Sequence, residues 1–412
     1  MKTRQIWILT EMYYPEETST GYFLTQTAEG LATNFAVSVL TGPATNGLRP
    51  VKAPALEMRN GVSIYRCVGT VFAKESMTGR IFNLLTRAFS IAIQAVIKVR
   101  AGDAVMAVTN PPLLPFLGLV ASVLTRSRFV LLVHDVYPEA MVAAGLLRPG
   151  SLLLKIGEMA NRLLYRSCRR IVVLGRDMAA LVGAKLLSDQ TVVLIPNWAA
   201  IEEVQPMPKS DNMLLRDLGI VSKFVVLYAG NLGRTHGVEQ IVGLAVALSE
   251  RGSEIHILVA GTGAKRKWLT ETVARQQIAN VTLIAPCPRA ELKMLLNACD
   301  VAVIPLVGGM KGVSVPSRLY NQLAAGRAVI AVADAGSELA LVVAEERVGW
   351  VVSPDDTAGL VDAVLAASRS PAELAVMGGR AAEVARRKYS LTNANKAYAE
   401  LFDGLFAAKP GK

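Results

Sequence analysis

Three loops in the second half of the chain combine glycine residues with cationic side chains, a composition typical of phosphate binding. They comprise residues 228–237, with Gly230, Asn231 and Arg234; residues 259–266, with Gly261, Gly263 and Lys265; and residues 313–321, with Ser317, Arg318, Tyr320 and Asn321. Each loop lies between a strand-like run and a helix-like run. Glycine lets the backbone approach a phosphate closely, and a helix N-terminus adds partial positive charge. Together the three loops predict a binding site for a diphosphate.

Each loop also has an explanation that involves no ligand. Tight turns require glycine, and Ser317 behind Pro316 could simply cap a helix. The loop at 259–266 begins like a dinucleotide fingerprint but lacks the third glycine, which disfavours a nicotinamide dehydrogenase. The sequence contains no Asp-x-Asp triplet of the kind that holds a metal on the phosphates of a diphosphate. We therefore predict that fixed charges and backbone N–H groups stabilise those phosphates without a metal.

His134 and Asp135 follow a strand-like run and are candidate catalytic residues of the first half. Side chains at the carboxyl end of a parallel strand lie at the edge where ligands bind. Of the other two histidines, His236 lies in the first glycine loop, and His256 lies within a strand-like run, as a structural residue would. The alternative for His134 is a hydrogen-bonded interior histidine. Glu17 is the third candidate, and it could equally be an ordinary loop carboxylate.

The elements that must position these residues form two series of short apolar runs separated by helical periodicity. The first series is 5–10, 36–40, 62–67, 104–109, 129–133, 171–174 and 192–195, and the second is 224–229, 255–260, 281–284, 301–304, 328–331 and 349–352. Parallel strands covered by helices on both faces give such continuous apolar runs. Residues 201–212 are polar, contain two prolines and predict a linker. We expect an α/β protein of two doubly wound domains, with ligands bound between them.

The first half of the chain is strongly basic. Residues 1–200 contain 21 Lys and Arg against 12 Asp and Glu, whereas residues 201–412 contain 23 against 21. Between Glu75 and Asp135 the only acid is Asp103. The side chains between the bases are aliphatic rather than aromatic, which favours an anionic membrane surface over nucleic acid as the partner.

The candidate membrane contact is a helix predicted at 79–100, widened by the apolar segment 111–124. Periodicity alone favours burial of the helix's apolar stripe on the sheet, with solvated cations such as Arg87 beside it. The local lack of acids favours membrane contact, and both interpretations can hold for different faces. No uninterrupted apolar run is long enough to span a bilayer, the longest being 113–124. Four scattered cysteines and the lack of a signal-peptide pattern predict a location in the cytoplasm or at the inner face of the plasma membrane.

Five motifs in order resemble those of the retaining family-4 glycosyltransferases of the GT-B fold. They are residues 14–21, containing Glu17 and Gly21; the His-Asp-Val-Tyr-Pro-Glu segment 134–139; Val-Leu-Ile-Pro-Asn-Trp at 193–198; Gly-Asn-Leu-Gly at 230–233; and Pro-Ser-Arg-Leu-Tyr at 316–320. The likeness covers nearly the whole chain. It is greatest to the bacterial branch that makes surface polysaccharides, which includes fucosamine and fucose transferases.

The resemblance implies two Rossmann-like domains facing a central cleft. Residues 1–198 would bind the acceptor, 199–215 would be a linker, 216–389 would bind the nucleotide sugar, and 390–412 would form a helix crossing back to the first domain. The enzyme would move a hexosyl, deoxyhexosyl or N-acetylhexosaminyl unit, with retention and without a cofactor. The donor would be a nucleotide-diphosphate sugar, expected to carry UDP, and the acceptor a polyprenyl-diphosphate-linked saccharide.

The resemblance also assigns roles to the residues named above. His134 and Asp135 would line the sugar pocket, and Glu17 would orient the donor sugar or the acceptor. Backbone N–H groups at Gly21 and Ser317, with the cations Arg234, Lys265 and Arg318, would stabilise the leaving phosphates.

The sequence departs from the family at four positions. His236 replaces a lysine, Arg318 replaces a lysine, and Asn321 replaces the glutamate that binds the donor ribose. Cys287 stands where relatives often have a glycine before the backbone that contacts the base. These changes leave open a non-catalytic sugar-nucleotide binding protein, or a nucleotide-sugar epimerase of the same architecture.

Overall fold

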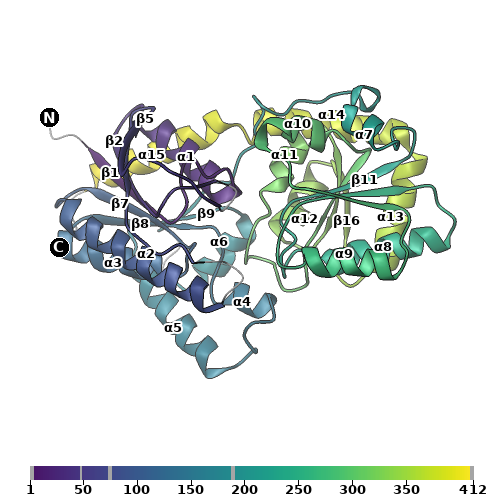
Figure 1. Cartoon of the computed structure of the whole chain (residues 1–412). Helices are drawn as coiled ribbons and strands as arrows, with labels where there is room; N and C mark the ends of the chain where they lie inside the picture. The colour runs from purple at the N-terminus through teal and green to yellow at the C-terminus, as the bar shows by residue number, and fades with distance from the viewer. Residues whose placement is uncertain (1–3, 47–48, 73–76, 187–190, 409–412) are drawn as a thin grey trace. The chain divides into compact units, whose positions relative to one another are not determined.

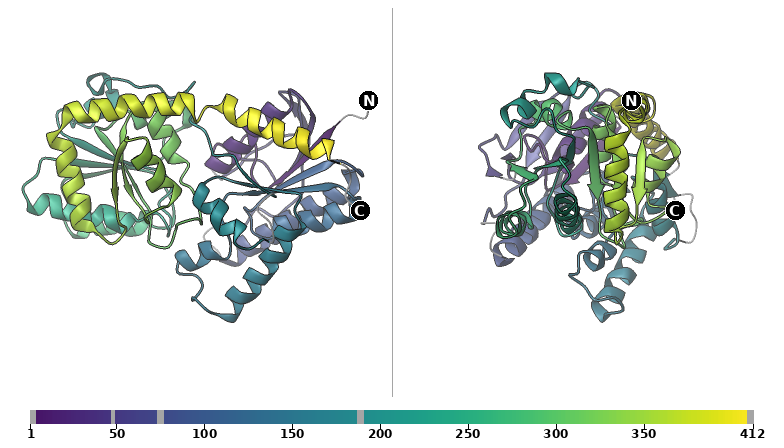
Figure 2. Two further views of the ribbon diagram at one scale, coloured as in Figure 1. Left: turned by 180° about the vertical axis from the view of Figure 1, so that it is seen from behind. Right: turned by 90° about the vertical axis from the view of Figure 1, so that its right-hand side faces the viewer.

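The computed structural model describes residues 4–46, 49–72, 77–186 and 191–408. The chain divides into two compact units (Figure 1). Unit 1 comprises Met1–Pro138, Pro149–Pro196 and Thr392–Lys412, and unit 2 comprises Glu139–Arg148 and Asn197–Leu391. Each unit is a sheet covered by helices on both faces, as continuous apolar strands require (Figures 1 and 2).

The sheet of unit 1 has the strand order β10-β9-β8-β7-β1-β2-β6-β5. Its strands are β1 (Gln5–Thr10), β2 (Ala36–Thr41), β5 (Leu56–Arg59), β6 (Val62–Arg66), β7 (Ala104–Val108), β8 (Arg128–Val133), β9 (Arg170–Val173) and β10 (Val192–Leu194). All pair in parallel except β5, which is antiparallel to β6. A separate two-stranded ribbon consists of β3 (Thr45–Asn46) and β4 (Arg49–Pro50). Every apolar run predicted as a strand in this half is confirmed.

The helices of unit 1 are α1 (Ser19–Leu31), α2 (Met77–Lys98), α3 (Leu114–Thr125), α5 (Leu152–Ser167), α6 (Arg176–Gly183) and, from Thr392 onward, α15 (Leu391–Ala407). Helices α2, α3 and α5 lie side by side on one face of the sheet (Figure 1). Helix α15 runs beside the N-terminal strand (Figure 2). Its Phe402 ring lies 6.2 Å from the Phe35 ring, and Asn395 fits against Gly30, where a Cβ atom would lie 2.3 Å from the amide.

Unit 2 contains a fully parallel sheet of order β13-β12-β11-β14-β15-β16. The strands are β11 (Val225–Ala229), β12 (His256–Ala260), β13 (Val281–Ile284), β14 (Val301–Pro305), β15 (Ala328–Val332) and β16 (Gly349–Val352). The helices are α4 (Glu139–Ala143), α7 (Met213–Asp217), α8 (Val238–Glu250), α9 (Arg266–Arg275), α10 (Leu292–Leu296), α11 (Arg318–Ala324), α12 (Glu338–Glu345), α13 (Thr357–Arg369) and α14 (Pro371–Arg387). The six predicted strands of this half are likewise confirmed.

The segment predicted as a linker packs as part of unit 2. Val204 and Asn212 are buried, and the Met207 N–H donates to Asn297 Oδ1 at 2.9 Å. The Asn212 side chain accepts from Leu215 N at 3.1 Å and so starts α7. The polar residues that suggested a free connection therefore satisfy backbone groups within the fold.

Helix α2 contains a segment that is long and apolar enough by composition to be a candidate membrane span, although its apolar run is interrupted. Residues Ile81–Lys98 have the length and apolar composition of a membrane span, with a mean hydropathy of 1.3, and exceed the predicted longest candidate 113–124. Scattered polar residues interrupt the run without lowering its mean hydropathy enough to exclude it. A third of the segment is buried inside unit 1, with Ala88, Ile91 and Ala95 packed against the fold.

Candidate active site

The first two glycine loops of unit 2 bind each other through their backbones. Gly230 N donates to Ala260 O at 2.9 Å, Leu232 N to Thr262 O at 2.8 Å, and Lys265 N to Leu232 O at 2.8 Å. A Cβ atom on Gly261 would lie 1.9 Å from the Gly230 carbonyl oxygen. Glycine at position 261 is therefore needed for the close approach, and the loops form one rigid surface at the carboxyl ends of β11 and β12.

This contact predicts a large effect for Gly261→Ala. The added methyl group must push the two loops apart, so we expect a lowered melting temperature and a loss of nucleotide binding, measured by thermal shift with and without UDP. Gly379→Ala in α14 is the matched control, because no atom lies within 4 Å of its added Cβ. That control should be neutral or slightly stabilising. A Gly261→Ala protein that binds UDP normally would contradict the rigid-surface interpretation.

Arg318 brings the third loop to the same place. Its Nη2 donates to Pro305 O at 3.0 Å, and its guanidinium carbon lies 4.8 Å from the centre of the Tyr228 ring. Nη1 lies 3.2 Å from the position of a Cβ on Gly230. The Nε and Nη1 atoms are buried and have no hydrogen-bond partner in the described part of the chain. Buried donors without a partner are costly, and an anionic ligand beside Gly230 would satisfy them.

Ser317 precedes α11 but makes no capping hydrogen bond with its side chain. The simple capping explanation for this serine is therefore wrong. Tyr320 is fully buried and packs edge-on against Tyr389, with ring centres 4.8 Å apart. This places its ring in the interior of unit 2.

The cations of the first two loops differ in their surroundings. Lys265 pairs with Glu239 at 2.6 Å and also donates to the carbonyl oxygen of Arg234 at 3.3 Å. Lys265 therefore ties the two loops together, and Glu239 offsets its charge. Sequence reasoning missed Glu239, which lies in the first turn of α8. The Arg234 and Asn231 side chains are exposed, while Gly263 lies against Leu232, where a Cβ would be 2.6 Å from the carbonyl oxygen.

The pKa of His236 reflects the positive electrostatic potential of this surface. Burial lowers its pKa to about 3, and the neighbouring positive charges of Arg318 and Lys265 lower it further in the same direction. The imidazole is consequently neutral at physiological pH. The cationic field that disfavours a protonated histidine is the field that favours a bound phosphate.

Asn321 and Cys287 each interact with other parts of unit 2. Asn321 Oδ1 accepts from the backbone N–H of Ala200 at 3.2 Å, which leaves its amide nitrogen for other partners. Cys287 is half-buried, and burial raises the pKa of its thiol. The sulfur is thus a neutral group at physiological pH.

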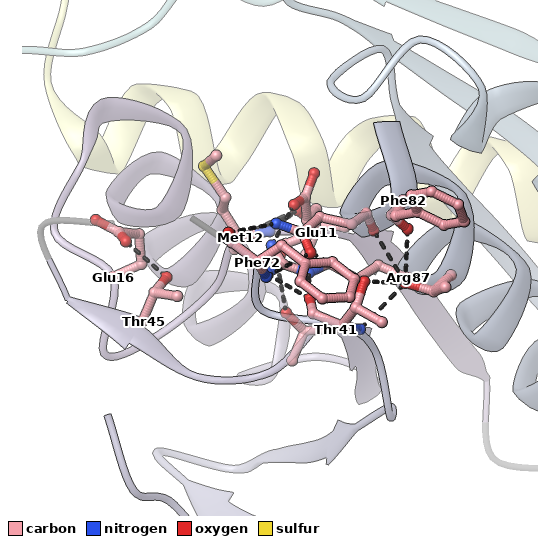
Figure 3. A network of polar contacts seen from close by, with 12 residues as sticks. Glu11, Met12, Glu16, Thr41, Thr45, Phe72, Phe82 and Arg87 are labelled. Carbon is pink, nitrogen blue, oxygen red and sulfur yellow. Dashed lines mark hydrogen bonds and ion pairs between the residues drawn. The ribbon is translucent and has the colours of Figure 1, made fainter. Parts of the chain in front are cut away.

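In unit 1, the loop after β1 is held by Glu16 rather than by Glu17. Glu16 is buried; its carboxylate accepts from Thr18 N at 3.0 Å and from Thr45 Oγ1 at 2.7 Å (Figure 3). Gly21 packs on the same residue, because a Cβ there would lie 2.5 Å from the Glu16 carbonyl oxygen. Glu17 is exposed. The loop is therefore built around one carboxylate and presents the next to solvent.

The same loop is anchored to α2 by a buried ion pair (Figure 3). Arg87 Nη1 lies 2.5 Å from Glu11 Oε1, and Arg87 Nε and Nη2 donate to Thr70 O at 3.0 and 2.9 Å. The expectation of a solvated Arg87 is wrong, since its side chain is only 8% exposed. The pairing could not be foreseen because the two residues are 76 positions apart.

His134 and Asp135 follow β8, and their backbone N–H groups donate to Thr109 Oγ1 at 3.0 and 3.2 Å. Thr109 follows β7, so one hydroxyl fixes the ends of two neighbouring strands. Burial lowers the pKa of His134 to about 4. A neutral imidazole can donate one hydrogen bond and accept another, as a sugar-binding residue must.

The lowered pKa values of His134 and His236 predict that the protein loses stability in acid. Because both pKa values are lower in the folded state than the unfolded value of about 6.5, the unfolded chain takes up more protons as the pH falls from 6.5 toward 4. We expect the free energy of unfolding to fall by roughly 1–2 kcal/mol per histidine between pH 7 and pH 5. Denaturation at both pH values should show a smaller pH effect in His134→Asn and His236→Asn. An unchanged slope in both variants would contradict this assignment.

Two family models cover most of the chain. Residues 20–198 match the "Glycosyl transferase 4-like domain", and residues 223–370 match "Glycosyl transferases group 1". "Probable glycosyltransferase WbjE" of Pseudomonas aeruginosa is 30% identical over 388 residues, which covers 94% of each chain. The chain belongs to the group 1, family-4-like glycosyltransferases.

Other similar proteins agree with this membership. "Putative colanic acid biosynthesis glycosyl transferase WcaI" of Escherichia coli K12 is 25% identical over 340 residues, or 79% of this glycosyltransferase and 83% of the relative. Among solved structures, sucrose-phosphate synthase of Thermosynechococcus elongatus has a TM-score of 0.79 at 18% identity, with 98% and 100% coverage. HepE of Anabaena, solved with UDP-glucose, has a TM-score of 0.70 at 15% identity, with 97% and 99% coverage. The predicted GT-B fold and the predicted enzyme class are confirmed.

In unit 2 of the glycosyltransferase, Gly230 and Gly261 directly follow β11 and β12, and Arg318 reaches the end of β14 through its hydrogen bond to Pro305 O. Gly230, Gly261 and Arg318 are brought together in unit 2, and Tyr320 is fully buried in the core. In the part of the chain that the structure describes, no group of three or more His, Cys, Asp or Glu side chains is placed to hold a metal ion.

Proposed function

We propose that this glycosyltransferase moves a sugar from a nucleotide-diphosphate sugar to a polyprenyl-diphosphate-linked saccharide. The observation that carries the proposal is the pair of buried, unpartnered N–H groups of Arg318 beside the Gly230 and Gly261 loops. This arrangement suits the diphosphate of a donor, which we propose to be UDP-linked. The structural likeness to HepE, solved with UDP-glucose, supports that donor.

The proposed setting is the synthesis of a bacterial surface polysaccharide at the cytoplasmic membrane. Support comes from the similarity to WcaI, whose name refers to colanic acid biosynthesis, and from the resemblance of the motifs to the fucosamine and fucose transferase branch. In this proposal unit 2 binds the donor and unit 1 binds the acceptor, at a membrane that contains the polyprenyl chain.

The proposed reaction retains the anomeric configuration and needs neither a metal nor a cofactor. The bond between the anomeric carbon and the β-phosphate oxygen breaks as the acceptor hydroxyl oxygen bonds the same face of that carbon. The acceptor proton passes to the leaving phosphate. Arg318 and the backbone N–H group at Ser317 stabilise the negative charge on that phosphate, and Lys265 holds the loops that bind it.

The remaining residues would position the sugar. A neutral His134 can hydrogen-bond a sugar hydroxyl while Thr109 fixes the backbone on which it stands. The exposed carboxylate of Glu17 is free to orient the donor sugar or the acceptor. Asn321 can offer its amide nitrogen to the ribose, a weaker substitute for a carboxylate acceptor.

The test is a mass-spectrometric transfer assay in the presence of EDTA. Purified protein is given a panel of UDP- and GDP-sugars together with polyprenyl-diphosphate saccharides. A product heavier by one sugar supports the proposal and identifies the donor. Tight nucleotide binding without product from any pairing would favour a non-catalytic binding protein instead, and activity that EDTA abolishes would overturn the metal-independent mechanism.

A further inference from the structure

Helix α5 presents a row of large apolar side chains to solvent. Leu152, Leu153, Ile156, Met159 and Leu163 are exposed to between 49% and 73%. The N-terminus of the helix is capped, because the Ser151 hydroxyl accepts a hydrogen bond from Leu154 N at 3.3 Å. Exposing five such residues on one helix is unfavourable in water, and contiguous apolar patches of this kind mark interaction surfaces.

The opposite face of α5 fixes this orientation. Asn161, Leu164 and Tyr165 are buried, and the Asn161 amide donates to the carbonyl oxygen of Tyr137. The helix cannot rotate its apolar row inward without breaking that hydrogen bond and exposing Tyr165. The exposed row is therefore a fixed feature of unit 1.

The neighbouring helices extend the apolar row of α5 into a wider surface. Helix α5 contacts α3, which contacts α2, on the same face of the sheet (Figure 1). Val120, Val123 and Leu124 of α3 are 55–68% exposed. On α2 the exposed large side chains are Ile81, Phe82, Leu85, Phe89, Ile93, Val96 and Ile97, each 37–57% exposed. We call these residues of α2, α3 and α5 the apolar face.

Cations line one side of the α5 row. Lys155, Arg162 and Arg166 are exposed and recur at spacings of seven and four residues, so they share one stripe of the helix. None of the three forms an ion pair within the described ranges of the chain. The sequences of α2, α3 and α5 contain a single acid, Glu158. An apolar stripe flanked by lysine and arginine is the pattern of a helix that lies in a membrane interface.

We propose that the apolar face docks on a bilayer containing anionic phospholipids, with Lys155, Arg162 and Arg166 contacting lipid phosphates. The proposal deepens the proposed function, because it states where a lipid-linked acceptor would be met. Residues 79–100 and 111–124 were predicted from sequence as the membrane contact, and α5 adds a cationic border formed by Lys155, Arg162 and Arg166.

The face lies on the membrane rather than crossing it. Among the helices that the structure describes, only α2 is long and apolar enough to span a membrane, but its Arg87 side chain is buried and paired with Glu11. Crossing would require α2 to leave the sheet and carry that arginine into hydrocarbon, at a high cost.

The experiment is flotation of the full-length protein with vesicles of phosphatidylcholine, alone or with 30% phosphatidylglycerol (about a third of the lipid, enough to give a strongly negative surface). The wild type should float with the anionic vesicles. The triple variant Lys155→Gln, Arg162→Gln, Arg166→Gln should bind them about a hundredfold more weakly, since each basic residue contributes roughly one kilocalorie per mole near such a surface. A second triple variant, Leu152→Ser, Met159→Ser, Leu163→Ser, should also lose binding.

The matched control removes the same charge from exposed residues of unit 2, as Lys267→Gln, Arg275→Gln, Lys293→Gln. It should float like the wild type, and UDP thermal shifts should show that every variant is folded. Equal flotation of all four proteins, or of none, would overturn the proposal. So would a wild-type dimer that the serine variant abolishes without any vesicle binding, because a second copy would then cover the face. Flotation needs no turnover, so its failure is separate from failure of the transfer assay.

Discussion

Replacing Arg318 by alanine should lower the rate of sugar transfer by about 100- to 1000-fold. The physical reason is the loss of the buried guanidinium whose Nε and Nη1 have no partner within the described fold and would bind the departing phosphate. Removing one preorganised donor of this kind from a catalytic site typically has an effect of that size. The measurement is the initial rate of product formation at saturating donor and acceptor, followed by mass spectrometry.

Two further variants make this result interpretable. Arg318→Lys retains the charge but loses the planar fork, so it should keep more activity than alanine. Arg275→Ala, an exposed arginine of unit 2, should keep the wild-type rate. If Arg318→Ala remained within about threefold of the wild type while folded, Arg318 would have no role in charge stabilisation.

Breaking the pair between Arg87 and Glu11 should destabilise unit 1 by roughly 3–5 kcal/mol, because removing one partner leaves a buried charge uncompensated. Arg87→Ala also leaves the Thr70 carbonyl oxygen without two donors. The expected result is a large fall in the midpoint of urea denaturation. We also expect weaker transfer, since Glu11 begins the loop that carries Glu17.

A second ion pair in the same unit provides the control. Arg4 and Asp403 are also 2.5 Å apart, but their side chains are 52% and 58% exposed. Arg4→Ala should therefore cost no more than about 1 kcal/mol. Similar losses from Arg4→Ala and Arg87→Ala would refute burial as the source of the difference.

The strands could be predicted from sequence because burial on both faces leaves an uninterrupted apolar run. All five residues of β11 are buried, and so are those of β14. Strand β5 was not predicted because it is not buried on both faces. Leu56–Arg59 lies at the sheet edge and alternates between exposed and half-buried residues. Its pattern is too short and too polar to separate from a loop.

The candidate site was predictable where glycine marks a close backbone approach, as at Gly261 and Gly263. It was not predictable where two similar side chains compete for one role. Glu16 and Glu17 are adjacent and identical, and one of the partners that distinguish the buried Glu16 is Thr45, 29 residues away. In the same way Glu239 partly neutralises Lys265 across two loops. Tertiary contacts of this kind leave no local signal in the sequence.

The place of α15 in unit 1 has a consequence for the order in which the protein is made. Strand β1 is synthesised first, yet Phe35, Gly30 and Arg4 receive their partners Phe402, Asn395 and Asp403 only after all of unit 2 has left the ribosome. The earlier part of unit 1 must therefore wait, with an apolar strip uncovered, until the last helix arrives. Unit 2 lies within one continuous stretch apart from Glu139–Arg148 and can complete its core sooner. The unit that begins the chain is thus the last to be finished.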